Sequence, residues 1–244
     1  MTAGVRTPDT TWRSRVKHLA DAVVNFVFPP TCASCNAPGS LFCADCLEKV
    51  SWLKEPLCPR CGRIVSRPTD CCSSCRSRAL PLRQMRAAVL FADPIPPVIH
   101  KLKYHSLYAL AEPLAALMVT SWSQWALSAD LIIPIPLHAA RLRERGFNQS
   151  ELIARHLSRQ VNIPCDPAAL HRTRHTRPQV GLNAAERHAN LVGAFRANQA
   201  RVDGKKILLV DDVCTTGTTL SEAANALLAA GASAVSAYCL ARAS

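Results

Sequence analysis

The sequence predicts an α/β protein in which a parallel β-sheet flanked by helices follows a small cysteine-rich module. Two features of the 244-residue chain support this fold class. Nine of its twelve cysteines lie between residues 32 and 75, and from residue 84 onward short apolar runs alternate with segments of helical periodicity. A chain of this length, with 49% hydrophobic and 19% charged residues, can form one substantial core and one small module.

The first thirty residues are expected to form an N-terminal helix that packs on the rest of the chain. Its apolar side chains recur near helical spacing, at Trp12, Val16, Leu19, Val23 and Val27. A helix that lies on a membrane surface is the weaker alternative. No apolar run is long enough to span a bilayer, and no small-residue cleavage site follows the apolar patch, so we expect a cytoplasmic location.

Four CxxC pairs predict a double zinc ribbon over residues 31–80. They are Cys32/Cys35, Cys43/Cys46, Cys58/Cys61 and Cys72/Cys75. Each pair can fill two corners of a tetrahedron, so two pairs complete a structural zinc site without an open coordination position. Disulfides would explain the same count in a secreted chain, whereas thiols kept reduced in the cytosol favour metal. The simplest pairing is sequential, but crossed pairings remain open, as does Cys71 in place of Cys72.

The third predicted domain covers residues 81–244 and alternates strands with helices. We expect strands over residues 84–92, 131–136 and 234–241, and helices over residues 95–103 and 109–126 and from about residue 147. The run LIIPIP at residues 131–136 shows no polar alternation, which is typical of a strand buried on both faces of a parallel sheet.

The stretch ILLVDDVCTTGTTL, residues 207–220, predicts a strand, a tight loop and a helix. The apolar run of residues 207–210 forms the strand, which is expected to stop at the acids, and helical periodicity begins at Thr218 and lasts until Gly231. Ligands bind at the carboxyl ends of parallel strands, and a helix N-terminus presents unpaired amides to an anion. The loop is therefore a candidate phosphate cradle, formed by Thr215, Thr216, Gly217, Thr218 and Thr219.

Asp211 and Asp212 do not suit a phosphate, because carboxylates repel it, but they can accept hydrogen bonds from paired sugar hydroxyls. A ribose 5-phosphate has a phosphate on one side and a diol on the other, so it satisfies the loop and the acids together. The alternative is that the acids are solvated and the threonines only cap the next helix. No Gly-Lys-Ser/Thr or GxGxxG motif supports a Walker or Rossmann site.

Two further segments place basic and amide side chains near this edge of the sheet. After the strand at residues 131–136 come Arg141, Arg143, Arg145, Asn148 and Gln149, expected around the start of the helix that begins near Phe147. The irregular segment of residues 172–195 carries four arginines against one acid and is a candidate basic lid; its arginines are Arg172, Arg174, Arg177 and Arg187. A solvated charged loop is the alternative for the second segment.

The formal net charge of +12 indicates anionic partners, such as nucleotides, nucleic acid or a membrane surface. Thiolate ligation of two zinc ions would lower this charge but leave the protein basic. Aromatic residues make up only 5% of the chain, which argues against extensive stacking on the bases of a single strand.

These motifs together resemble the ComF family of competence proteins, which are similar to amidophosphoribosyltransferases. The resemblance covers nearly the whole chain after residue 25. It is carried by the CxxC pairs, HKLKYHS near residue 100, RERGFNQS at residues 143–150, the segment RTRHTRPQ…ERHANLVGAF, and the strand and loop with Thr-Thr-Gly-x-Thr.

The resemblance implies a type I phosphoribosyltransferase fold preceded by a zinc module, and an association with DNA uptake in natural transformation. It implies phosphoribosyl pyrophosphate as ligand, with magnesium bound through the pyrophosphate. Asp211 and Asp212 are then the expected catalytic residues, and Arg145, Asn148, Gln149, Arg172, Thr176 and Gln179 join the threonine loop as substrate contacts. The acceptor is not identified. The alternative function is a non-catalytic accessory protein that binds single-stranded DNA and proteins of the competence machinery.

Overall fold

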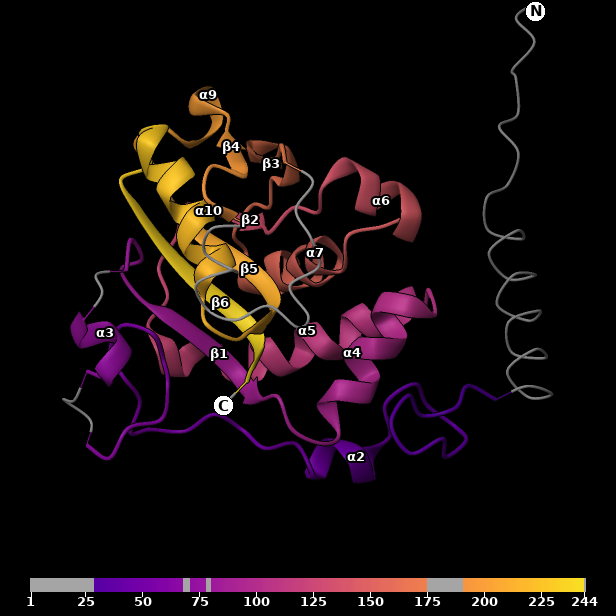
Figure 1. Cartoon of the computed structure of the whole chain (residues 1–244). Helices are drawn as coiled ribbons and strands as arrows, with labels where there is room; N and C mark the ends of the chain where they lie inside the picture. The colour runs from indigo at the N-terminus through magenta and orange to yellow at the C-terminus, as the bar shows by residue number, and fades with distance from the viewer. Residues whose placement is uncertain (1–28, 68–70, 78–79, 175–190, 244) are drawn as a thin grey trace, which may run out of the picture.

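The computed structural model describes residues 29–67, 71–77, 80–174 and 191–243 (Figure 1). The helix expected within residues 1–30 lies outside the described residues, apart from its last two positions. In the described part of the chain, no helix is both long and apolar enough to cross a membrane.

A parallel four-stranded sheet forms the centre of the larger domain, as expected. Its strands are β1 (Met85–Leu90), β6 (Ala234–Arg242), β5 (Lys206–Cys214) and β2 (Leu131–Pro134), in the spatial order β1-β6-β5-β2. The central pair is almost wholly buried because helices cover both faces of the sheet. All four carboxyl ends lie on one edge, since every pairing is parallel.

Helices flank the sheet on both faces (Figure 1). On one face α5 (Ala111–Thr120) packs against α7 (Gln149–Val161), and these two helices cover β1, β6, β5 and β2. On the other face α10 (Thr218–Ala229) lies over β6. The connection after β1 is α4 (Ile95–Tyr104), whose last turn reaches toward the carboxyl edge.

The helix expected over residues 109–126 is interrupted. A 3₁₀ turn, η1 (Tyr108–Leu110), precedes α5, and a second one, η2 (Trp122–Trp125), follows it. The break falls at Ser121, whose hydroxyl lies 2.7 Å from the Tyr238 hydroxyl of β6. The Tyr238 hydroxyl also donates to Met118 O at 2.7 Å. In a continuous helix this carbonyl would accept from the amide of Trp122, so the contact with β6 ends the helix where periodicity alone would continue it.

At the carboxyl edge one expectation is wrong, and one helix was not predicted. The strand does not stop at the acids: β5 continues to Cys214, because its pairing with β6 continues through Cys214 opposite Arg242. The basic run before residue 147 forms a separate helix, α6 (Ala139–Arg145), which ends at Gly146 with φ +81 before α7 begins.

The ends of the irregular segment form a small antiparallel pair, β3 (Leu170–Arg172) with β4 (Phe195–Ala197), which packs against α10. The 3₁₀ turn η3 (Pro167–Ala169) precedes β3, and α9 (Gln199–Val202) follows β4. Residues 175–190 lie outside the described part.

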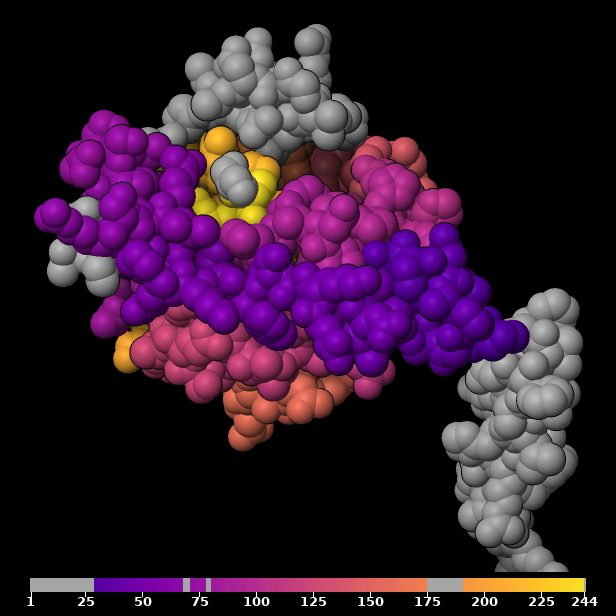
Figure 2. Space-filling view, turned by 90° about the horizontal axis from the view of Figure 1, so that it is seen from below, coloured from indigo at the N-terminus to yellow at the C-terminus, as the bar shows by residue number. Residues whose placement is uncertain are grey.

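The cysteine-rich module runs as a band across one face of the molecule (Figure 2). Its helices are α2 (Ala44–Glu48) and α3 (Ser73–Ser77). Between them, residues 51–53 pair with the free edge of β1: Leu90 donates to Ser51 O at 2.8 Å, and Leu53 donates to Ala88 O at 3.1 Å. The module therefore covers the edge strand of the sheet, and its buried side chains join the same apolar cluster as the sheet.

Candidate functional site

Two adjacent carboxylates form the centre of a polar cluster at the carboxyl edge of the sheet. Asp211 Oδ1 accepts a hydrogen bond of 2.8 Å from the Ser150 hydroxyl and one of 2.9 Å from the Asp212 amide. Asp212 Oδ1 accepts from Gln149 Nε2 at 3.2 Å, and its Oδ2 forms an ion pair with the Lys103 ammonium group. Protein groups from α4 and α7 thus hold both acids.

The start of α7 determines the positions of Gln149 and Ser150. Asn148 is the N-cap residue: its Oδ1 accepts from Ser150 N at 3.1 Å, and its Nδ2 donates to Ile135 O at 2.9 Å, just beyond β2. The side chain therefore satisfies an amide of the first turn and ties the helix to the sheet at once. Asn148 supports the site from behind, while Gln149 and Ser150 contact the acids directly.

Lys103 also belongs to this cluster, although its sequence motif predicts no role for it. It lies in the last turn of α4, its side chain is 22% exposed, and it reaches Asp212 across the edge of the sheet. Burial alone would lower the pKa of Lys103, but the negative charge of Asp212 outweighs burial and raises it. Lys103 is therefore a cation at neutral pH, and it offsets the charge of the acid pair.

The two carboxylates differ in protonation. Burial, followed by the neighbouring charge of Asp212, raises the pKa of Asp211 to about 8. Burial also acts to raise the pKa of Asp212, but Lys103 and the Gln149 hydrogen bond outweigh it and hold that pKa below its ordinary value. Asp212 is therefore the more acidic of the two, and Asp211 keeps its proton to a higher pH than an ordinary carboxyl group does.

The arginines of α6 are divided between the site and the surface. Arg145 Nη1 donates to Gln149 Oε1 at 2.5 Å, and its guanidinium lies 5.3 Å from the centroid of the Tyr104 ring. Arg141 instead pairs with Glu144 on its own helix at 2.9 Å. A hollow of about 150 Å³ separates α6 from the end of α4, and Lys103 and Arg145 both line it. This places two cations beside the acid pair.

The threonine loop follows β5 on the same edge. Thr215 and Thr216 are exposed, Gly217 has φ +77, and α10 begins at Thr218. The hydroxyl oxygens of Thr216 and Thr218 lie 2.9 Å apart. The first-turn amides of α10 have no acceptor within the helix, so the loop presents donors suited to an anion. Thr219 lies in the same turn.

Gly217 cannot carry a side chain without a change in this loop. Its positive φ disfavours other residues, and an added Cβ would lie 2.9 Å from the Met85 Cε atom. The glycine thus reflects both a turn and a close approach to β1.

Of the remaining substrate contacts expected from the sequence, only Arg172 lies in the described part of the chain. Arg172, in β3, has its guanidinium 5.8 Å from the Phe195 ring centroid. Burial lowers the pKa of Arg172, and the charge of Asp211 opposes that change. Thr176 and Gln179, like Arg177 and Arg187, lie outside the described residues.

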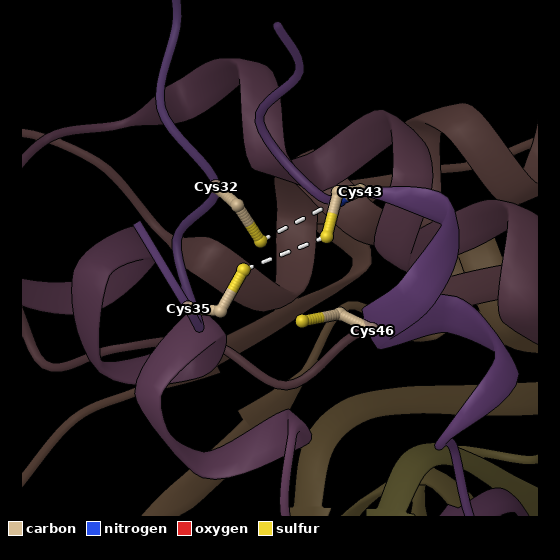
Figure 3. A group of neighbouring side chains, drawn as sticks. All are labelled: Cys32, Cys35, Cys43 and Cys46. Carbon is tan, nitrogen blue, oxygen red and sulfur yellow. Dashed lines mark hydrogen bonds between the residues drawn. The ribbon is translucent and has the colours of Figure 1, made fainter. Parts of the chain in front are cut away.

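The eight cysteines of the CxxC pairs come together in two groups of four, in the sequential arrangement. One group is Cys32, Cys35, Cys43 and Cys46, and the other is Cys58, Cys61, Cys72 and Cys75. The ligand atoms of each group lie within 4.8 Å of one another. In Figure 3 the four sulfurs of the first group point into one common space.

The spacing of these sulfurs suits zinc rather than disulfides. Sγ atoms lie 3.6 Å apart between Cys35 and Cys43, and 3.6 Å apart between Cys61 and Cys72. Tetrahedral ligation at about 2.3 Å separates sulfurs by roughly 3.8 Å, whereas a disulfide needs about 2 Å. Cys72, rather than Cys71, takes the position in the second group. The donors therefore fit two structural zinc ions.

Two family models match this chain. Residues 23–76 match the double zinc ribbon domain, and residues 148–244 match the phosphoribosyl transferase domain. The second match includes the start of α7, the acid pair and the threonine loop.

Relatives match nearly the whole chain. It is 34% identical over 223 residues to DNA utilization protein YhgH of Escherichia coli K12, which covers 88% of this chain and 97% of that protein. It is 29% identical over 208 residues to competence protein F of Haemophilus influenzae, covering 82% and 90%. Among solved structures, the chain is similar to glutamine phosphoribosylpyrophosphate amidotransferase from Bacillus subtilis. That match has 22% identity, covers 54% of this chain and 26% of that one, and has a TM-score of 0.39, too low to support an argument.

Proposed function

The chain belongs to the ComF family, and on that premise we propose that it binds phosphoribosyl pyrophosphate, or another ligand with a ribose 5-phosphate, at the carboxyl edge of its sheet. Homologues named for DNA utilization and competence support a role in DNA uptake during natural transformation. A cytoplasmic location is part of the proposal. The phosphoribosyl transferase domain match supports the choice of ligand.

In this proposal the 5-phosphate lies in the threonine loop and receives hydrogen bonds from the first-turn amides of α10 and from the threonine hydroxyls. The ribose diol lies against Asp211 and Asp212. Magnesium bound through the pyrophosphate would neutralise part of its charge. Arg145 and Arg172 are the proposed contacts of the pyrophosphate, and Lys103 adds a further cation beside the acids. Thr176 and Gln179 stay proposed contacts on the strength of the family resemblance alone.

The chemistry that this arrangement suits is departure of pyrophosphate from the anomeric carbon. Fixed cations favour the leaving group, and the carboxylates favour the positive charge that develops on the sugar. The protein would act mainly by positioning and neutralising charged groups.

The observation that carries the proposal is the pair of acids bound by α7 and Lys103. Asp212 is buried and Asp211 is half-buried just before the threonine loop, and neither side chain caps a helix. Burying two adjacent carboxylates is unfavourable without partners, and here α7 and Lys103 supply them. A cost of this kind close to the carboxyl edge of a parallel sheet favours a ligand site.

The test is a calorimetric titration of phosphoribosyl pyrophosphate with magnesium against wild type and the double variant Asp211→Asn/Asp212→Asn. We expect the double variant to lose measurable binding while retaining its circular dichroism spectrum. The matched control is Glu151→Gln, which removes an acid of α7 that forms an ion pair with the exposed Arg155. Unchanged affinity in the aspartate variant would remove the diol role.

A second candidate function is binding of single-stranded DNA, with or without catalysis. The basic charge of the chain and the names of its relatives favour it. Binding to the DNA backbone should weaken steeply with added salt and survive the aspartate substitutions, because it depends on phosphate contacts. An oligonucleotide that shows no binding at low salt would eliminate this candidate. Proteins of the competence machinery are further proposed partners.

A further inference from the structure

The second four-cysteine group lies directly against the strands that support the threonine loop. We call the turn of residues 58–61, which contains two cysteines of this group, the knuckle. Met85 N, at the start of β1, donates to Arg60 O at 2.7 Å. A Cβ on Gly62, just after the knuckle, would lie 2.6 Å from Met85 O, so the two backbones touch without room for a side chain. In Figure 2 the purple part of the module lies beside yellow atoms of the C-terminal segment.

Met85 connects this knuckle to the loop. Its backbone bonds the knuckle, and its buried side chain extends to the other side, where Sδ lies 3.3 Å from Cys214 Sγ. The end of the same side chain limits the space at Gly217. A displacement of the knuckle would therefore move the residue that packs under the loop, because close-packed interiors transmit such shifts.

Arg242 makes a second, independent connection. This arginine ends β6 and is only 4% exposed. Its Nη1 donates to Cys61 O at 2.7 Å and lies 3.6 Å from Cys214 Sγ, while its Nη2 lies 3.8 Å from Cys61 Sγ. A buried guanidinium needs negative partners, and a zinc ion with four thiolates has net negative charge. Zinc in the second group would therefore favour the position of Arg242.

The first group makes no comparable contact within the described residues. It approaches the larger domain at α4, where Lys101 Nζ donates to Asn36 Oδ1 at 2.9 Å. Cys35 of this group is exposed, whereas all four cysteines of the second group are buried. The two groups are therefore not equivalent with respect to the loop.

We propose that the second zinc group is part of the ribose-phosphate site: the knuckle of residues 58–61 holds the threonine loop in its binding shape through Met85 and Arg242, and the first group does not. This inference rests on the proposed function for the identity of the ligand. Met85 and Arg242 are positioning residues, because they act through Cys214 and Gly217 rather than on the ligand.

The experiment compares four single substitutions in the full-length protein. Cys75→Ser disrupts the second group and Cys46→Ser disrupts the first. Arg242→Gln breaks the link but keeps every cysteine. Its control is Arg86→Gln, which removes a 3.0 Å hydrogen bond to Pro59 O of the same knuckle. Arg86 contacts Met85 O and not Cys214. Two quantities are measured: affinity for phosphoribosyl pyrophosphate with magnesium, and hydrogen exchange of the amides of residues 214–221.

We expect Cys75→Ser and Arg242→Gln to weaken binding at least about tenfold and to speed exchange in the loop. Cys46→Ser and Arg86→Gln should do neither. If Cys75→Ser fails to fold, Arg242→Gln decides. The inference is overturned if Arg242→Gln exchanges like wild type, or if Cys46→Ser disturbs the loop as much as Cys75→Ser. A wild-type protein that binds no phosphoribosyl pyrophosphate contradicts the proposed function instead, and loop exchange still tests the connection.

Discussion

Lys103 and Asp212 bury opposite charges against each other, so removing either one leaves the other without its partner. The substitution Lys103→Met should lower the free energy of unfolding by roughly 2–3 kcal/mol, somewhat less than for a fully buried pair, because Lys103 keeps 22% exposure. It should also raise the pKa of Asp212, which loses the cation that now lowers it. Urea denaturation at neutral pH measures the first effect.

The control for that experiment is Lys101→Met, two residues earlier on α4, where the ammonium group bonds Asn36 at the exposed surface. Little change is expected there. Adding Asp212→Asn to Lys103→Met should recover part of the loss, since the buried carboxylate is then neutral. If the double variant is less stable by the sum of the two single losses, the pair does not interact as described.

Asp211 gives the molecule a pH dependence with a definite sign. Its folded pKa, about 8, lies above the ordinary value of 3.8, so the folded state binds the proton more tightly than the unfolded state. The stability due to this group is complete below about pH 4 and declines as the pH rises toward 8. We expect the unfolding free energy of Asp211→Asn to fall less than that of wild type over this window, as measured by denaturation at pH 5 and pH 8. Parallel curves would show that Asp211 ionises normally.

At the scale of elements, the loop between β5 and α10 depends on Gly217 for two separable reasons. Gly217→Ala should lower stability by about 1–2 kcal/mol and weaken binding of phosphoribosyl pyrophosphate, because the new methyl group meets Met85 and the left-handed φ is strained. Gly204→Ala is the matched control: Gly204 has φ +69, but a Cβ there meets nothing within 4 Å. The excess loss at Gly217 measures the close approach, and equal losses would mean that only the dihedral matters.

The sequence predicts the elements well where a local pattern determines them. Unbroken apolar runs identify β2 and most of β5, and the CxxC spacing identifies the ribbons, because each pattern reflects nearby residues. The continuation of β5 through Asp211 and Asp212 could not be predicted, since polar residues normally mark a strand end and the partners opposite them lie in β6. The break of the predicted helix at Ser121 likewise depends on Tyr238, more than a hundred residues away.

The same dependence on residues far apart in the sequence explains why Lys103 and Arg242 could not be assigned to the site. Asp211, Asp212, Gln149 and the threonines belong to compact motifs whose chemistry can be interpreted directly. Lys103 stands in the motif HKLKYHS, but its role requires that the last turn of α4 meet the end of β5. The link from Arg242 to Cys61 spans most of the chain and joins the two predicted domains, so no local spacing indicates it.

At the scale of the whole molecule, the zinc module and the sheet form one apolar core. Leu53 and Leu57 of the module belong to the same buried cluster as Met85 and Val89 of β1, and residues 51–53 hydrogen-bond along the free edge of that strand. A module of this size has too small a core of its own and depends on metal and on its neighbour. We infer that removing either the zinc module or the sheet domain destabilises the part that remains.

This coupling predicts a single unfolding transition in which zinc leaves as the sheet unfolds. Because the module shares its buried surface with β1 and contacts the end of β6 through Arg242, partial opening would expose an edge strand and a buried guanidinium together. Guanidinium titrations followed in parallel by circular dichroism and by a zinc-binding dye should give the same midpoint, and a chelator should lower it in both. Zinc release well before loss of secondary structure would show instead that the ribbons unfold as a separate unit from the sheet.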